Sequence, residues 1–337
     1  NADKVHAAGI MHWISLNGGQ TFTNTASWSD AANVKYVHAD IHDIFIRNNQ
    51  VWVSCDGGIF LSVDSGKLSF NRRQYGIQGT EFWGFGMGHK DADVMLGGTY
   101  HNSHLMKNGN VYQNGWISYT GSADGYRGFV NPGKPKTVYN DSGKDQLVQS
   151  RTLPFTRTSY DKRPNAGYFP GESCPLRWDP RSYNHFYSGV DSTLWKTEDD
   201  GASWTAIKTF ASGKIIDIEV AWSNPNVIYV VFAPTDFYAN KFIWKTTDAG
   251  KTWTNISLSS AVTNNNSSLA MDLTVSDSSE NDIWVGLIHP YNWNNADGNK
   301  IFYSSNGGLT YTNWTTTLLN GEGITNIEFY RGSSGGV

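Results

Sequence analysis

Residues 246–253 read TTDAGKTW, and this stretch decides the fold because its pattern recurs along the chain. A hydroxyl residue is followed two positions on by Asp or Asn, then two further by Gly, and finally by a hydroxyl and an aromatic residue. Each copy follows an apolar-alternating strand pattern such as KFIWKT and leads into another strand. The pattern predicts a β-hairpin whose turn uses Asp or Asn side-chain hydrogen bonds and a glycine with positive φ. The five copies are SLNGGQTF (Ser15 to Phe22), SVDSGKLSF (Ser62 to Phe70, one residue longer), TEDDGASW (Thr197 to Trp204), TTDAGKTW (Thr246 to Trp253) and SSNGGLTY (Ser304 to Tyr311), with Asn17, Asp64, Asp199, Asp248 and Asn306 at the Asp or Asn position.

The spacing of the copies predicts the number of repeats. The first positions are separated by 47, 135, 49 and 58 residues, and 135 is three times 45, so two middle repeats have lost the motif. A period of about 40–50 residues with four strands is typical of a propeller blade. The sequence therefore predicts an all-β, seven-bladed β-propeller as a single domain over 1–337. Its blades are 1–28 with 322–337, then 36–75, 80–120, 125–160, 174–208, 214–257 and 269–315.

The two ends of the chain supply one further period. Thirty-three residues follow Ser304 and Ser15 is the fifteenth residue, which together make 48. The segment Ile324 to Gly332 is therefore predicted to be the first strand of the blade that residues 4–28 continue. Such closure joins both ends in one sheet and leaves no exposed sheet edge.

The composition fits short strands joined by tight turns. Charged residues make up 17% of the chain, aromatic residues 14%, and 35 residues are glycine. A net charge of −4 gives no electrostatic reason to expect nucleic acid as a partner. No apolar run reaches the roughly 18 residues of a membrane helix, so membrane insertion is not expected. Because the first residue is Asn, we expect one module of a larger secreted or cell-surface protein.

The five copies resemble the Asp boxes, or BNR repeats, of sialidases, sortilin-type receptors and xyloglucanase-type glycoside hydrolases. Within residues 36–141 the order HADIHDIFI, CDGGIFLSVDSG, LGGTYHNS and GSADGYRGFVNP is similar to bacterial sortilin-like propellers, also called BNR glycosyl hydrolase-like propellers. Where that family would have Gln-Asp-Asn, this chain has Tyr100, His101 and Asn102. The resemblance therefore implies the fold, while the missing carboxylate argues against hydrolysis.

Two groups of residues could carry chemistry. His38, Asp40 and His42 alternate along a predicted strand and would share one face, where they could bind zinc or a similar metal. Their spacing along one strand is wide for a single ion, and a hydrogen-bonded inner strand is the alternative. Asp56 lies in a DGG turn and Asp124 in an SADG turn; a glycosidase needs two such carboxyl groups, although turn chemistry alone accounts for both. Cys55, in the strand VWVSC, is interpreted as a buried thiol, with pairing to Cys174 as the alternative.

Aromatic residues in or beside predicted loops could contact a ligand, since exposed rings stack on sugars and anchor protein partners. Long loops are predicted at 152–174 and 289–299, where the strand pattern is lost. By contrast, Trp204 and Trp253 belong to the boxes and are expected to pack between blades. The candidate ligand-binding residues are Trp83, Tyr100, His101, Asn102, Trp116, Tyr126, Tyr168, Tyr291 and Trp293.

Two functions follow from these patterns. The first is an extracellular or cell-surface recognition propeller that binds a glycan or a peptide or protein through loops on one face. The alternative is a glycoside hydrolase of the xyloglucanase-like Asp-box type that uses Asp56 and Asp124. No cofactor is expected for either function.

Overall fold

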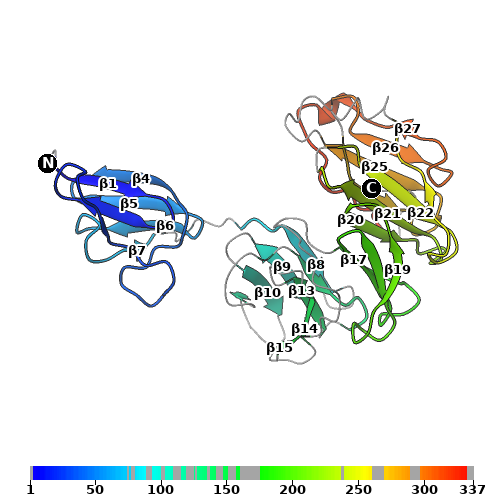
Figure 1. Ribbon diagram of the computed structural model, residues 1–337, viewed down its shortest axis with the longest axis horizontal. Coiled ribbons are helices and arrows are strands. Elements are labelled where there is room, and N and C mark those ends of the chain that lie inside the picture. The colour runs from blue at the N-terminus through cyan, green and yellow to red at the C-terminus, as the bar shows by residue number, and fades with distance from the viewer. Residues whose placement is uncertain are drawn as a thin grey trace. The chain divides into compact units, whose positions relative to one another are not determined.

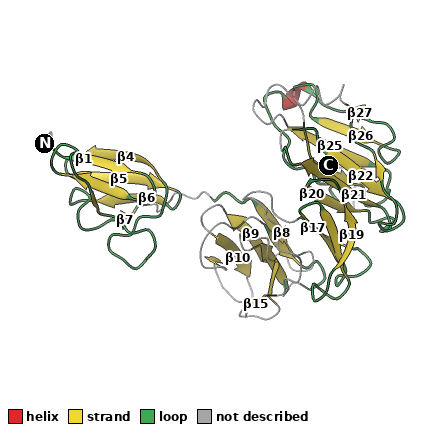
Figure 2. Cartoon of the chain, viewed as in Figure 1, coloured by secondary structure: helices red, strands yellow, loops and turns green. Residues whose placement is uncertain are grey.

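The computed structural model describes residues 3–73, 76, 80–88, 93–99, 103–108, 115–118, 125, 127–134, 137–141, 147–150, 157–159, 175–236, 239–259, 269–288 and 297–331. Within these residues 27 strands form seven antiparallel sheets, and one short 3-10 helix spans Thr317–Leu319. In every sheet the strands are hydrogen-bonded in the order in which the chain runs (Figures 1 and 2). No helix in the described part of the chain is long and apolar enough to cross a membrane.

The chain divides into two compact units, of which the first lies mainly within Asn1–Phe82. This unit contains a three-stranded sheet and a four-stranded sheet. The strands of the first sheet are β1 (Val5–Ala8), β2 (His12–Ser15) and β3 (Thr23–Asn24), and those of the second are β4 (Ile41–Arg47), β5 (Gln50–Cys55), β6 (Gly58–Ser62) and β7 (Asn71–Arg72).

The second unit contains five four-stranded sheets. In chain order they are β8 (Gly84–Met87), β9 (Val94–Thr99), β10 (Ser103–Asn108) and β11 (Trp116–Ser118); β12 (Gly128–Val130), β13 (Val138–Asp141), β14 (Leu147–Ser150) and β15 (Arg157–Ser159); β16 (Leu176–Trp178), β17 (Phe186–Val190), β18 (Thr193–Thr197) and β19 (Thr205–Thr209); β20 (Gly213–Val220), β21 (Ile228–Pro234), β22 (Phe242–Thr246) and β23 (Thr254–Asn255); and β24 (Leu269–Val275), β25 (Ile283–Ile288), β26 (Ile301–Ser304) and β27 (Thr312–Asn313).

No strand extends more than one residue beyond its predicted repeat. Three details differ from the prediction. The loop predicted at 152–174 contains β15, which pairs with β14. The first sheet has three strands rather than four, because residues 324–331, the described part of the strand predicted at Ile324 to Gly332, form no ladder. Their main-chain N–H groups are instead bonded to β24 and β25.

The five recurring turns have the hydrogen bonds that their residues predict. In the turn after β22, the Thr246 hydroxyl donates to Asp248 Oδ1 at 2.7 Å and accepts the Gly250 N–H at 3.0 Å. Asp248 Oδ1 also accepts the Thr252 N–H at 2.9 Å. Each turn carries a glycine with φ between 75° and 96°, which a Cβ would disfavour. The matching hydroxyl to Asp or Asn bonds join Ser15 to Asn17, Ser62 to Asp64, Thr197 to Asp199 and Ser304 to Asn306.

Two box aromatic residues, Trp204 and Trp253, pack between neighbouring sheets, as expected. Trp204 meets Phe186 edge-on at 5.4 Å, in a cluster that includes Tyr139 from the preceding sheet. Trp253 meets Phe210 at 5.4 Å, in the cluster between the next two sheets. Packing of these two rings therefore ties the third and fourth sheets of the second unit each to its predecessor.

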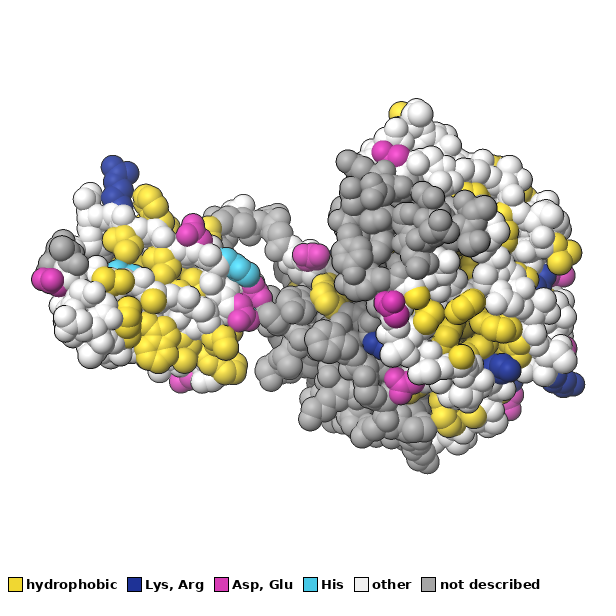
Figure 3. Space-filling view, turned by 45° about the horizontal axis from the view of Figure 1, so that its top comes forward, with side chains coloured by type: hydrophobic (Ala, Val, Ile, Leu, Met, Phe, Trp, Pro, Cys, Tyr) yellow, Lys and Arg dark blue, Asp and Glu magenta, His cyan; other side chains and the backbone are white. Residues whose placement is uncertain are grey.

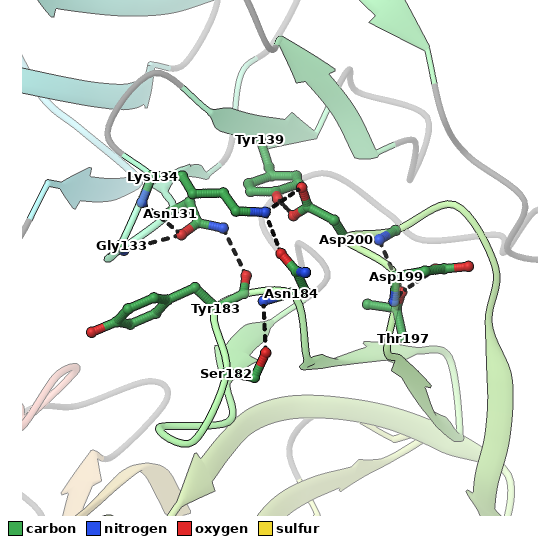
Figure 4. A network of polar contacts seen from close by, with 11 residues as sticks. Asn131, Gly133, Lys134, Tyr139, Ser182, Tyr183, Asn184, Thr197, Asp199 and Asp200 are labelled. Atoms are coloured by element: carbon green, nitrogen blue, oxygen red, sulfur yellow. Dashed lines mark hydrogen bonds and ion pairs between the residues drawn. The ribbon is translucent and has the colours of Figure 1, made fainter.

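Polar contacts join the sheet of β12–β15 to the sheet of β16–β19 at the turns between their strands (Figure 4). Asn131, which follows β12, donates from Nδ2 to the Tyr183 carbonyl at 2.8 Å. Lys134 Nζ bonds to the side chains of Asn184 and Asp200, and the Tyr139 hydroxyl donates to Asp200. Figure 4 shows Lys134 and Tyr139 converging on Asp200 from one sheet to the next.

Candidate functional site

The structure pairs two residues that the sequence had assigned to different sites. His42 Nε2 lies 2.5 Å from Asp56 Oδ1, between β4 and the turn that follows β5. The His42 side chain is 68% exposed and that of Asp56 only 16%, so the ring faces solvent while the carboxylate is mostly buried. Such a pair could accept or deliver a proton at the free ring nitrogen. Asp124, the other predicted catalytic carboxylate, lies outside the described residues.

The predicted metal set is not assembled. His38 and Asp40 precede β4, and Asp40 has φ of 60°, which breaks the extended backbone that the alternation required. The ladder also shifts register between Ile41 and Asp43, at His42. His38 instead packs over Gly57, and among the described residues no three His, Cys, Asp or Glu side chains are grouped to hold a metal ion. The prediction that the three residues share one face of a strand was therefore wrong.

Two of the predicted ligand-binding aromatic residues can be located. Trp83 directly precedes β8 and is 40% exposed, and Trp116 lies in β11 and is 42% exposed. The Trp116 ring is 6.2 Å from the Phe85 ring of β8, so Trp116 packs on the sheet rather than in a loop. The positions predicted at Tyr100, His101, Asn102, Tyr126, Tyr168, Tyr291 and Trp293 lie outside the described residues.

Cys55 is a buried free thiol. Burial raises its pKa to about 11, and its Sγ lies 3.4 Å from the Gly58 carbonyl. The thiol is therefore protonated at neutral pH and is a poor nucleophile. Cys174 lies outside the described residues.

A buried polar cluster in the second unit was missed by the sequence analysis. Asp217 in β20 uses both carboxyl oxygens: Oδ1 accepts the Ile218 N–H at 2.8 Å, and Oδ2 accepts the Leu273 N–H of β24 at 3.1 Å. Asp272 holds the corresponding position in β24, the first strand of the next sheet. Its Oδ2 accepts the Ile327 N–H and the Asn326 Nδ2, both at 2.8 Å. The two carboxyl groups thus link β20 to β24 and β24 to the C-terminal segment.

Arginine 177 brings positive charge to this cluster from β16. Its Nε donates to the Ile218 carbonyl at 3.0 Å, and its Nη2 forms ion pairs with Glu219 and Glu328. Burial raises the pKa of Glu219 to about 8 despite the Arg177 charge, and burial together with the Asp217 charge raises that of Asp272. The buried carboxyl group of Asp272 acts here as a hydrogen-bonding support between strands rather than as an accessible acid.

A sequence signal for this cluster does exist. Asp43, Asp217 and Asp272 each precede an aliphatic residue in the first strand of a sheet, and each directly follows a shift in register. The strand patterns IIDIEVA (215–221), AMDLTVS (270–276) and ITNIEFY (324–330) align at this position. Comparison of first strands, rather than of turns alone, would have found the cluster.

Residues 192–332 match a protein-family model, Sortilin-Vps10, described as sortilin, neurotensin receptor 3. No curated protein sequence matches the chain.

Several solved propellers share the fold. The GH74 enzyme of Niastella koreensis has a TM-score of 0.57 at 19% identity, over 86% of this chain and 49% of that enzyme, so the chain spans about half its length. The Cps50 (Swd1) β-propeller domain of Myceliophteria thermophila has a TM-score of 0.53 at 11% identity, over 87% and 91% of the two chains. YCF48 from Cyanidioschyzon merolae has 0.52 at 12%, over 88% and 91%. At these identities the likeness shows the fold alone. The family match and the propeller neighbours together confirm that this chain resembles the sortilin-like Asp-box propellers.

Proposed function

We propose that this chain is an extracellular or cell-surface recognition propeller that binds a peptide, protein or glycan, as one module of a larger protein. The observation that carries the proposal is the match of residues 192–332 to a family whose description names a neurotensin receptor. The carboxyl groups of Asp217 and Asp272 add support for binding rather than hydrolysis. Both are buried and bonded between strands, so neither is accessible as a catalytic acid. Loops on one face, including Tyr291 and Trp293, would supply the contacts.

Binding assays on the purified chain test this proposal. We expect saturable binding in a glycan array or to an immobilised peptide library. In the variant Tyr291→Ala/Trp293→Ala the affinity should fall about tenfold or more while the free energy of unfolding stays unchanged. Leu309→Ala, at a residue 78% exposed, is the control. The glycoside hydrolase would be established instead if no ligand binds saturably and the chain releases reducing ends from a polysaccharide, provided that Asp56→Asn abolishes this release.

We also propose that the seven sheets form a closed ring, in which residues 324–331 complete the first sheet. Support comes from the way this segment lies on β24. The Ile327 N–H bonds to Asp272 as the Leu273 N–H bonds to Asp217. A Cβ on Gly286 would meet Ile324 at 2.6 Å, just as one on Gly189 would meet Ile215 at 2.7 Å. The segment therefore occupies the position of a first strand beside the last sheet.

The register of the other sheets predicts how this strand would pair. The residue opposite the box hydroxyl in the second strand is Val51 in one sheet and Ile228 in another, and their first-strand partners are Ile46 and Val220. In the first sheet the residue opposite Ser15 is Val5. Because Phe329 aligns with Val220, it would lie opposite Val5, and Ile327 would lie opposite Ala7.

The box glycines support the same closure. A Cβ on Gly250 would meet Ile207 of the preceding sheet at 2.3 Å, and one on Gly308 would meet Ile256 at 2.4 Å. Among the described residues, no atom lies within 4 Å of such a Cβ on Gly19. Trp314 follows its box at the same spacing as Ile256 and is 47% exposed. In a closed ring Trp314 would cover Gly19.

Closure would leave apolar side chains at the surface of an isolated unit, and they are present. Figure 3 shows hydrophobic side chains on the face of the first unit that is turned to the viewer. In that unit Phe22, the box aromatic, is 42% exposed, whereas its counterpart Phe70 is 6% exposed. Contiguous exposed apolar faces mark interaction surfaces. Trp83 and Trp116 of the second unit are proposed to bind a ligand, and packing against a neighbouring sheet is the alternative role for both.

A further inference from the structure

We propose that Asp272 is a proton-dependent latch that holds the C-terminal segment, residues 324–331, against β24. The segment makes two main-chain bonds to side chains of this strand. The Ile327 N–H bonds to Asp272 Oδ2 at 2.8 Å, and the Phe329 N–H bonds to the Thr274 hydroxyl at 2.9 Å. Only the first of these acceptors can change its charge.

A count of charges around Asp272 shows why this cluster of carboxyl groups must hold a proton. The acidic residues Asp217, Glu219 and Asp272 are 6%, 2% and 7% exposed. The positive group that faces them is Arg177 from β16, which is bonded to Glu219 and also meets Glu328 of the segment. Arg331, the other nearby cation, pairs with Glu328 and stacks on Trp222. Three buried carboxylates cannot be balanced by one guanidinium, so proton uptake is the lower-energy solution.

The neutral carboxyl of Asp272 fits its surroundings. Burial, and then the Asp217 charge, raise its pKa, and they outweigh the hydrogen bond from the Ile327 N–H, which lowers it. Ionisation would place two negative carboxylates in contact inside the protein. Separation of the segment from β24 would relieve this repulsion by admitting water. The folded segment therefore binds more protons than the released one, so its attachment weakens as pH rises through the raised pKa.

Release of the segment can be followed by amide hydrogen exchange in the full chain. After correction for intrinsic exchange, we expect protection of the Ile327 amide to fall about tenfold or more between pH 7 and 10, since each unit of pKa corresponds to roughly tenfold. Asp272→Asn keeps an acceptor oxygen and cannot ionise, so its protection should stay constant over this range. Thr274→Val is the matched control: it should lower protection of Phe329 by the same factor at every pH.

Identical pH profiles for the wild type and Asp272→Asn would overturn the latch. If Asp272→Asn does not fold, the carboxyl carbon of Asp272 in the wild type decides by NMR titration. A midpoint above pH 7 supports the latch, and one near 4 contradicts it. The latch lies wholly within the second unit, so this result does not depend on ligand binding or on closure. If the ring is closed, the latch would also govern its opening.

Discussion

Replacement of Phe186 by alanine is expected to lower the free energy of unfolding by about 3–5 kcal/mol, the range for a fully buried Phe. The Phe186 side chain has no exposed surface. Its ring lies 5.3 Å from Tyr139, 5.6 Å from Trp178 and 5.4 Å from Trp204, so it joins two sheets of the second unit. The surrounding aromatic rings are held by their own strands and cannot collapse into the cavity. Urea unfolding followed by tryptophan fluorescence measures the loss.

Two variants calibrate this measurement. Phe186→Leu retains most of the volume and should cost less than half as much, about 1–1.5 kcal/mol. Leu309→Ala removes an exposed apolar side chain and should change stability by no more than about 0.5 kcal/mol. A loss below about 1 kcal/mol in Phe186→Ala would contradict the packing of these two sheets.

Acid is expected to destabilise the first unit through His12. This side chain is fully buried; its Nδ1 lies 2.7 Å from the Thr25 hydroxyl and its Nε2 lies 3.0 Å from His6 Nδ1. Burial and then the His6 charge lower the pKa of His12 from 6.5 to about 4. The unfolded chain therefore binds more protons between pH 6.5 and 4, and stability is lost as pH falls through this window. The loss amounts to about 3 kcal/mol and is complete below pH 4.

The variant His12→Gln isolates this contribution. Its difference in unfolding free energy between pH 7 and 4 should be smaller than that of the wild type by about 3 kcal/mol, because all carboxyl titrations are common to both. The ring titration of His12, followed by NMR, provides a direct check. A His12 midpoint near 6.5 would show that the ring is not buried as a neutral group.

Short-range chemistry made the turns and the sheets predictable. The box residues use bonds that span two to four positions, as between Thr246, Asp248 and Gly250, so a single sequence contains everything that the turn needs. The spacing of the turns, at multiples of roughly 45–58 residues, then predicted the number of sheets. The same logic identified Trp204 and Trp253 as packing residues, because every copy of the box ends in an aromatic residue.

Contacts between sheets were harder to predict. The bond from Asp217 to Leu273 spans 56 residues, and no local pattern specifies it. The metal hypothesis failed because strict alternation was assumed at His38, Asp40 and His42, where positive φ at Asp40 and a register shift at His42 break the strand. A single side chain can redirect the backbone at such points, and composition gives no warning of it.

Disulfide formation between the two ends of the chain tests the closed ring most directly. In a Cys55→Ser/Cys174→Ser background, the pair Ala7→Cys/Ile327→Cys would lie directly opposite across neighbouring strands, where Cβ atoms are about 4.5–5.5 Å apart. The account predicts an intramolecular disulfide under mild oxidation, seen as a monomer with altered mobility on a non-reducing gel. The pair Ala7→Cys/Glu328→Cys is one residue out of register and should cross-link poorly. Absence of the intramolecular bond in the first pair, or equal cross-linking in both, would contradict the closed ring.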